Sequence, residues 1–143
     1  MAYKSRKYKE PTNPVGTVAE LFAGVGGFRI GLAEAGWKTV YSNQWEPSTK
    51  IQHASAVYEN RFGKNGHSNE DIAQVDVSKI PDHDLLVGGF PCQDFSHAGK
   101  RKGFDSNRGT LYQSYVELVK RVKPLVFVAE NANGLLTMPG DPI

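Results

Sequence analysis

The chain of 143 residues contains one cysteine, and the residues around it mark it as a candidate nucleophile. Cys92 lies in the sequence Gly88-Gly89-Phe90-Pro91-Cys92-Gln93, directly after the apolar run at 84–87. A free cysteine is most often a buried hydrophobic residue. This one follows an apolar run, which places it at the carboxyl end of a buried strand, where open α/β sheets carry their ligands. The neighbours therefore favour the nucleophile.

A glycine-rich turn at Ala23–Gly27 is the second candidate site. Glycine lets the backbone approach a nucleotide-like ligand closely between the first strand and the first helix of an α/β fold. The dinucleotide pattern G-x-G-x-x-G would require glycine in place of Arg29, and the chain has no Gly-Lys-Ser/Thr phosphate loop. The turn predicts a ligand with an adenosine group and no phosphate. A purely structural turn is the alternative.

Residues after the next two expected strands could complete a pocket for adenosine. Trp45 offers a ring that can stack on adenine, and Gln44 and Glu46 can hydrogen-bond a ribose. Asp76 follows the third expected strand and can accept a hydrogen bond from an exocyclic amine. These positions favour a ligand-binding turn over a structural one.

The elements that must position these residues alternate along the chain. Apolar runs alternate with longer amphipathic stretches, which predicts an α/β fold with a parallel sheet and helices on both faces. We expect strands at 17–22, 38–42, 72–77, 84–87 and 125–129, and helices at 28–35, 47–62 and 109–122. Residues 63–70 are expected to form a polar loop, and residues 90–108 a long loop rich in glycine, serine and lysine.

The composition is that of one globular domain, with 39% hydrophobic residues and a net charge of +2. No stretch approaches the roughly 18 apolar residues that span a membrane. The polar, basic N-terminus has no secretory signal, and with a single cysteine this predicts a reducing, cytoplasmic setting. We expect neither a membrane nor a metal among the partners.

Short segments in a fixed order resemble the signatures of the DNA cytosine carbon-5 methyltransferases, which use S-adenosylmethionine. The matching segments are Glu20–Phe28, Tyr41–Glu46, Asp76–Val77, Gly89–Gln93, Arg108–Leu111 and Glu130–Asn131. The resemblance implies a Rossmann-like methyltransferase fold that ends after its fifth strand. It also implies double-stranded DNA as the substrate and a place in a restriction-modification system.

The resemblance assigns catalytic roles to residues at two strand ends. Cys92 would add to carbon 6 of cytosine, because this makes carbon 5 nucleophilic toward a methyl group. Glu130 would protonate or hydrogen-bond ring nitrogen 3. The neighbouring Pro91, Gln93 and Asn131 would complete the catalytic site.

The cofactor site implied by the resemblance draws on several strand ends. Its expected residues are Phe22, Gly24, Gly26, Gly27, Gln44, Trp45, Glu46, Asp76, Val77, Phe90 and Leu111. Two residues depart from the family's pattern. Glu20 stands where the family usually has aspartate, and Gln44 stands where most members have the ribose-binding carboxylate. Ribose binding would then be weakened or shared with Glu46.

A target base must leave the duplex before an enzyme can react with it. The loop at 93–108 is suited to close over such a base, because it combines glycine and serine with basic residues. The expected DNA contacts are Ser96, Lys100, Arg101, Lys102 and Arg108. Cationic side chains of this kind bind phosphates and set the position of the protein on DNA.

The resemblance divides the chain into a basic leader at 1–16 and a partial catalytic domain at 17–143, without the target-recognition region. The apolar strand at 125–129 would then be an exposed edge. Three interpretations stay open: a split enzyme with a second polypeptide for target recognition, a truncated and inactive product, or a non-catalytic adenosine-binding or DNA-associated module.

Overall fold

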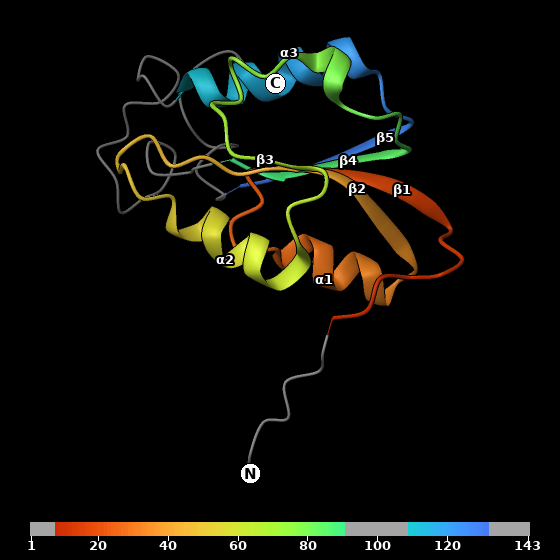
Figure 1. Cartoon of the computed structure of the whole chain (residues 1–143). Helices are drawn as coiled ribbons and strands as arrows, with labels where there is room; N and C mark the ends of the chain where they lie inside the picture. Colours follow the sequence, from red (N-terminus) through yellow and green to blue (C-terminus); the bar gives the residue numbers. More distant parts are fainter. Residues whose placement is uncertain (1–7, 91–108, 132–143) are drawn as a thin grey trace.

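A computed structural model describes residues 8–90 and 109–131. Within them, a five-stranded parallel sheet with the order β3-β2-β1-β4-β5 lies between two layers of helices (Figure 1). The elements are β1 (Gly16–Leu21), α1 (Gly27–Glu34), β2 (Trp37–Asn43), α2 (His53–Phe62), β3 (His67–Ser68), the 3-10 helix η1 (Val77–Lys79), β4 (Leu85–Gly89), α3 (Gly109–Val122) and β5 (Val126–Glu130). The predicted α/β fold is confirmed.

β1 and β4 form the centre of the sheet. β1 pairs with β2 on one side and with β4 on the other, and β4 also pairs with β5. Side chains of both central strands are buried in clusters on the two faces of the sheet. Their nearly continuous apolar runs are typical of buried parallel strands. On the α3 face, Leu21 and Leu86 pack with Tyr115 and Leu118. On the opposite face, β1 and β4 residues pack with side chains of α1 and with Trp37, the first residue of β2.

The helices divide between the two faces of this sheet. Figure 1 shows α1 and α2 on one face and α3 on the other. α1 follows Gly26, whose φ of 89° is left-handed, and the chain turns into β2 at Gly36, whose φ is 87°. Glycine adopts such angles without strain. None of the helices described here is long and apolar enough to cross a membrane.

The helix expected at 47–62 begins later than predicted, at His53. The side chain of Gln52 organises the preceding turn: its Oε1 accepts from the Glu46 N–H at 2.6 Å, and its Nε2 donates to the carbonyl oxygens of Glu46 and Thr49, each at 2.8 Å. The Glu46 carboxylate then accepts from the Ala54 N–H at 3.1 Å, in the first turn of α2. Side-chain hydrogen bonding thus replaces the first helical turns that the sequence pattern predicted.

The third strand was predicted in the wrong place. Residues 72–77 are not a strand; β3 lies at His67–Ser68, inside the segment expected to be a polar loop. Parallel pairing to β2 selects this segment, because the Ser42 N–H donates to Gly66 O at 2.8 Å. The His67 ring then lies 2.8 Å from the hydroxyls of Ser42 and Ser55. Polar side chains satisfy each other here, so the strand lacks an apolar pattern.

β5 forms one edge of the sheet and exposes apolar side chains. Its position is one residue later than the expected 125–129. Val126, Phe127 and Val128 are 57%, 55% and 44% exposed. Among the residues described, β4 is the only strand that pairs with β5, and Tyr115 of α3 ties it down by donating from its hydroxyl to Val128 O at 2.9 Å. The expected exposed apolar edge is confirmed for these residues.

We expect the Tyr115→Phe variant to lower the free energy of unfolding by about 1 kcal/mol, because it removes one hydrogen bond and keeps the buried ring. Urea unfolding of the variant and the unaltered chain measures this difference. An unchanged midpoint would show that the Tyr115 hydroxyl does not hold β5 to α3.

Candidate active site

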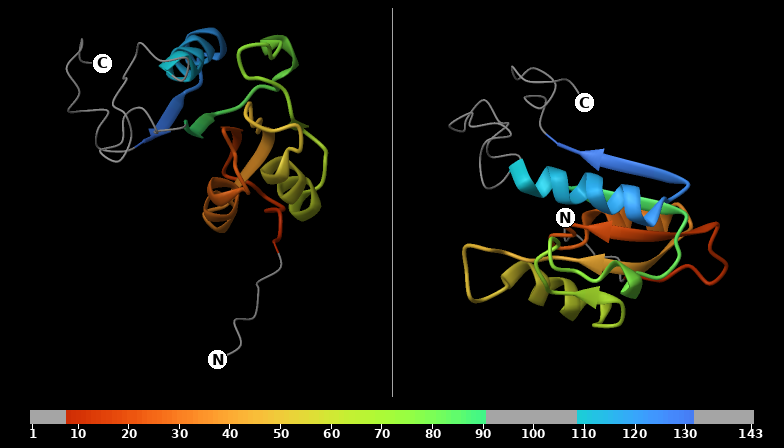
Figure 2. Two further views of the ribbon diagram at one scale, coloured as in Figure 1. Left: turned by 90° about the vertical axis from the view of Figure 1, so that its left-hand side faces the viewer. Right: turned by 90° about the horizontal axis from the view of Figure 1, so that it is seen from above.

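The strands of the sheet run in one direction, so their carboxyl ends gather on one side of the molecule (Figure 2). Residues that follow β1, β2, β4 and β5 meet there, as the sequence predicted. The Ala23 N–H donates to Asn43 O at 3.0 Å across the ends of β1 and β2. The Asn131 Nδ2 donates to Phe90 O at 2.9 Å across the ends of β5 and β4. Ligand sites of open parallel sheets lie at this edge.

The turn after β1 holds its backbone in a left-handed conformation at three positions. Phe22 has a φ of 53°, Gly24 of 54° and Gly26 of 89°. The Gly26 N–H donates to Ala23 O at 2.8 Å, which closes the turn. A bulky side chain rarely adopts positive φ, and residues held in such conformations cluster at ligand sites. The geometry of Phe22 is therefore independent support for a binding turn.

The glycines of this turn serve different purposes. A Cβ atom on Gly26 would overlap the ring of Phe62 in α2, whereas Cβ atoms on Gly24 and Gly27 would meet nothing within 4 Å. Gly26 is therefore needed for packing against α2. Gly24 and Gly27 leave open space beside the backbone, where a ligand can approach.

Gln44 has a role in the turn that the sequence did not reveal. Its Oε1 accepts a hydrogen bond from the Gly24 N–H at 2.8 Å. The side chain therefore fixes the glycine turn from the end of β2. Trp45 is half-buried next to it, and Glu46 caps the first turn of α2. The Glu46 carboxylate thus already has one partner at the Ala54 N–H.

Asp76 and Val77 do not lie at the end of a strand, which corrects the reason for selecting them. The Asp76 Oδ1 accepts from the N–H of Ser78 at 3.0 Å and from its hydroxyl at 2.7 Å, so that it caps η1. These hydrogen bonds lower the pKa of the Asp76 carboxyl. Val77 begins η1 and packs against the core.

The residues that follow the observed β3 were missed. Ile72 is buried in the core, and Asp71 accepts a hydrogen bond from the Ala73 N–H at 3.0 Å. The Asn43 Nδ2 donates to Glu70 O at 2.9 Å and holds this segment beside the end of β2. Asp71-Ile72 and Asp76-Val77 are both an acidic residue followed by an apolar one, and only the position of the third strand distinguishes the two pairs.

Glu130 ends β5 directly beside the end of β4, as predicted. It pairs in register with Gly89, and a Cβ on Gly89 would lie 2.9 Å from the Glu130 Oε2. A Cβ on Gly88 would lie 2.8 Å from the ring of Tyr115. The two glycines therefore make room for different neighbours, one for a candidate catalytic carboxylate and the other for α3. Phe90, which follows, is buried with its ring centroid 6.0 Å from that of Tyr115.

Several predicted residues lie outside the described part of the chain. They are the catalytic candidates Pro91, Cys92 and Gln93, and the DNA-contacting candidates Ser96, Lys100, Arg101, Lys102 and Arg108. Leu111 lies in α3. Within residues 8–90 and 109–131, no group of three His, Cys, Asp or Glu side chains could hold a metal ion.

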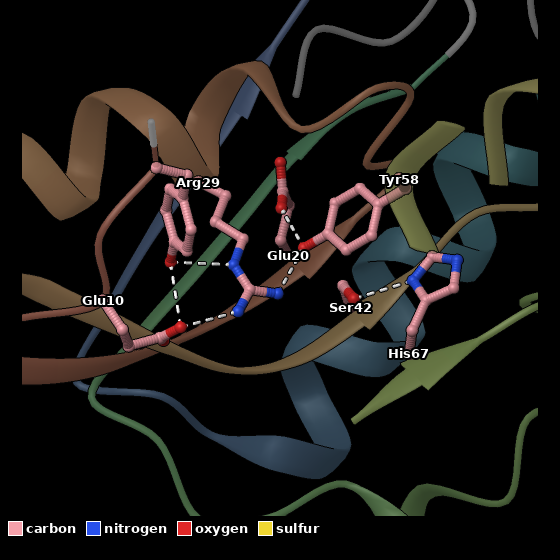
Figure 3. A network of polar contacts seen from close by, with 7 residues as sticks. Glu10, Glu20, Arg29, Ser42, Tyr58 and His67 are labelled. Carbon is pink, nitrogen blue, oxygen red and sulfur yellow. Dashed lines mark hydrogen bonds and ion pairs between the residues drawn. The ribbon is translucent and has the colours of Figure 1, made fainter. Parts of the chain in front are cut away.

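A buried polar network lies beneath the glycine turn. Glu20 of β1 is fully buried, and burial raises the pKa of its carboxyl to about 7, against hydrogen bonding from Tyr58 and Arg29 that lowers it. The Tyr58 hydroxyl donates to Glu20 Oε2 at 3.0 Å, and Arg29 NH1 donates to that hydroxyl at 3.2 Å (Figure 3). An acid with such a pKa changes its charge near neutral pH.

Solved structures define the fold class. The crystal structure of S. pombe Dnmt2 methyltransferase matches 87% of this chain and 36% of its own, with a TM-score of 0.60 and 21% sequence identity. An S-adenosylmethionine dependent methyltransferase from Mesorhizobium loti matches 90% of this chain and 52% of its own, with a TM-score of 0.50 and 14% identity. The fold is that of the S-adenosylmethionine-dependent methyltransferases.

The sequence comparisons identify the family. The model of the C-5 cytosine-specific DNA methylases matches residues 16–141. Type II methyltransferase M.HhaI of Haemophilus parahaemolyticus is 47% identical over 112 residues, and M.NgoBI of Neisseria gonorrhoeae is 43% identical over 118. These alignments cover 78% and 82% of this chain, and 32% and 35% of the relatives. The chain belongs to the C-5 cytosine-specific DNA methylase family and spans about a third of the length of these relatives.

Alanine substitution at Gly24 and at Gly26 should show which of the two glycines is needed for packing against α2. Gly24→Ala should lower stability by about 1–2 kcal/mol, the strain of left-handed backbone. Gly26→Ala should lower it further, because the new methyl group overlaps Phe62. Thermal unfolding of both variants measures the order, and equal losses would contradict the division of roles.

Proposed function

We propose that this chain forms the cofactor-binding and nucleophile-bearing part of a DNA cytosine carbon-5 methyltransferase. Membership of the C-5 cytosine-specific DNA methylase family supports this function. The observation that carries it is the pairing of Glu130 with Gly89 at the carboxyl edge of the sheet. Cys92 follows Gly89 by three residues in the sequence, and the strand that ends at Gly89 pairs with the strand that ends at Glu130.

S-adenosylmethionine would bind across the ends of β1, β2 and β3. The open backbone at Gly24 and Gly27 leaves room for the cofactor, and Trp45 offers a ring for its adenine. The Gln44 amide oxygen already accepts from the Gly24 N–H, so the ribose hydroxyls would be bound by Glu46, whose Oε2 accepts from the Ala54 N–H and whose Oε1 has no hydrogen-bond partner among the described residues.

The adenine amine would be bound by Asp71, with Ile72 as the apolar wall, because this pair follows the observed third strand. This assignment replaces Asp76, whose carboxylate caps η1. Phe22, Phe90 and Leu111 stay expected walls of the cofactor site.

The chemistry requires a nucleophile and an acid on one base. The Cys92 thiolate would form a bond to carbon 6 of cytosine, and Glu130 would give a proton or a hydrogen bond to nitrogen 3 to take up the displaced electron pair. Carbon 5 then carries the electron density needed for attack on a methyl group. S-adenosylmethionine supplies that methyl group. Methyl transfer breaks the S–CH3 bond of the cofactor, which leaves as the thioether S-adenosylhomocysteine. Transfer of the carbon 5 proton to solvent, expulsion of the Cys92 thiolate and return of the nitrogen 3 proton to Glu130 would then restore the double bond and the enzyme.

DNA would be held by the segment around the nucleophile. The base must be extruded to reach a thiolate, and energy for extrusion comes from contacts to the rest of the strand. Lys100, Arg101, Lys102 and Arg108 are expected at phosphates, with Ser96 beside them.

The exposed apolar edge would bind the remainder of a methyltransferase. A groove of about 510 Å³ lies between α1 and β5, lined by Gly27, Phe28, Gly31, Leu32 and Glu130. Together with the exposed side chains of Val126, Phe127 and Val128 it forms an exposed apolar surface. We assign this surface to contact with the two thirds of the relatives' length that the chain does not span.

We expect the Cys92→Ser variant to bind S-adenosylmethionine as the unaltered chain does and to lose methyl transfer to DNA. The hydroxyl is far less acidic than the thiol, so it supplies no nucleophile at neutral pH. Labelled methyl transfer measures this after addition of a second polypeptide that spans the remaining length of M.HhaI. Transfer by the serine variant would contradict the assigned nucleophile. The chain alone should transfer no methyl group to DNA.

Glu130→Gln should reduce methyl transfer by about 100- to 10,000-fold in the same complex, the usual contribution of a positioned acid. Glu117→Gln is the matched control, because Glu117 is exposed on α3 and pairs only with Lys120 among the described residues. Equal activity of the two variants would remove Glu130 from the mechanism.

A further inference from the structure

A buried guanidinium lies beneath the glycine turn, outside the proposed ligand contacts. Arg29 of α1 is 6% exposed and donates in three directions. Its Nε binds the Tyr8 hydroxyl at 3.0 Å, its NH2 binds Glu10 Oε2 at 2.9 Å, and its NH1 binds the Tyr58 hydroxyl at 3.2 Å. The rings of Tyr8, Tyr58 and Phe62 lie 4.8–5.6 Å from the guanidinium carbon. The side chain is therefore held on all these sides.

Glu20 closes the inner end of this network and is not fully satisfied by it. Its Oε2 accepts from the Tyr58 hydroxyl, whereas its Oε1 is buried and has no hydrogen-bond partner among the described residues. The main-chain N–H of Arg29 lies near enough to lower the pKa of the carboxyl, although burial raises it more. Arg29 thus reaches Glu20 with its side chain only through Tyr58. Ionisation of a buried carboxyl group with so few hydrogen bonds is costly.

The network joins the two ends of the glycine turn. Glu20 lies two residues before Phe22, where the left-handed backbone begins, and Arg29 lies two residues after Gly27, where α1 begins. Tyr58 of α2 bonds to both, so the strand end and the helix start are linked beneath the turn. Figure 3 shows the Glu20 carboxylate and the Arg29 guanidinium meeting at the Tyr58 hydroxyl.

The outer side of the network belongs to the leader. Tyr8 and Glu10 precede residue 16, where the match to the family model begins. Both contact the Arg29 guanidinium from outside, and the Glu10–Arg29 pair is an ion pair of 2.9 Å. The leader therefore holds a residue in the first turn of α1.

We propose that Glu20 is a positioning residue for the cofactor turn: through Tyr58 and Arg29 it holds the backbone of residues 22–27 in the geometry that receives the ligand. Tyr8 and Glu10 lock the outer side of the same network. The inference rests on the proposed role of the turn in cofactor binding.

Ionised Glu20 is the better acceptor for the Tyr58 hydroxyl and the Arg29 N–H, so the turn is best held above neutral pH. The titratable groups that face this site are Tyr58 from α2, Arg29 from α1, and Tyr8 and Glu10 beyond Arg29. His67 of β3 stacks on Tyr58 with ring centroids 4.5 Å apart, and burial lowers its pKa.

Stability and cofactor affinity should change in opposite directions with pH. The pKa of folded Glu20 is about 7 against an ordinary value of 4.5, so the folded chain binds the proton more tightly than the unfolded chain. The contribution of this group to stability therefore rises as the pH falls from about 7 to 4.5. Over the same range Glu20 loses its charge, so its hydrogen bond with Tyr58 weakens and the turn is less firmly held. A residue with a merely structural role would move both quantities together.

The test follows the amide resonances of Gly24, Gly26 and Gly27 by NMR in the full chain between pH 5.5 and 8.5. The unaltered chain should show one titration shared by the three glycines with a midpoint near pH 7. Glu20→Gln should abolish it, and Tyr58→Phe should reduce it while keeping the buried ring. Glu34→Gln is the control, because Glu34 is an exposed acid at the end of α1, the helix that contains Arg29. An unchanged glycine titration in Glu20→Gln would overturn the proposal. If Glu20→Gln does not fold, Tyr58→Phe takes its place, and an unchanged titration in Tyr58→Phe would then overturn the proposal.

Titration calorimetry with S-adenosylmethionine at pH 6 and pH 8 completes the test. If only the ionised form receives the ligand, affinity should fall about tenfold at pH 6, the loss expected when about a tenth of the molecules are competent. Glu20→Gln should remove this dependence. Equal affinity at both pH values in the unaltered chain would overturn the proposal. Absence of binding at any pH would contradict the cofactor function instead, and the glycine titration would still decide the role of Glu20.

Discussion

The parallel pairing of β1 with both β2 and β4 is the constraint on which the rest of the structure depends. It buries Val18, Ala19 and Leu21 completely and directs the ends of the central strands to one edge. The glycine turn, Gln44 and the end of β4 lie at this edge because each follows or ends one of the three paired strands. Site geometry in this fold is thus a consequence of backbone hydrogen bonding between strands.

The glycine turn depends on support from below as much as on its own residues. Gly26 has no side chain, which leaves room for the Phe62 ring. At the end of the neighbouring strand, Gln44 accepts a hydrogen bond from the Gly24 N–H. Glu20 and Arg29 are joined under the same turn through Tyr58. Strained backbone at Phe22 persists because these contacts fix its surroundings. Binding of a flexible cofactor is helped when the protein has already adopted the receptive geometry.

The sequence was sufficient wherever apolar runs carry the information. The central strands, α1, α3 and the pairing of Glu130 with the end of β4 follow from burial on both faces and from the order of elements. It failed where polar side chains replace apolar pattern. β3 is held by the hydrogen bond from the Ser42 N–H to Gly66 O and by the contact of the His67 ring with the Ser42 hydroxyl. The start of α2 is set by the hydrogen bonds of Gln52. The buried network around Arg29 was also invisible, because a cation in an amphipathic stretch reads as a surface residue.

The central claim is that the carboxyl edge of this sheet receives S-adenosylmethionine. The most direct measurement is NMR mapping of amide shifts in the full chain as the cofactor is added. The account predicts the largest shifts at Phe22–Gly27, Trp45 and Asp71–Ile72. Shifts centred instead on Gln113, Glu117 and Arg121, which line a pocket of about 260 Å³ on α3, or no shifts at the glycine turn, would contradict it.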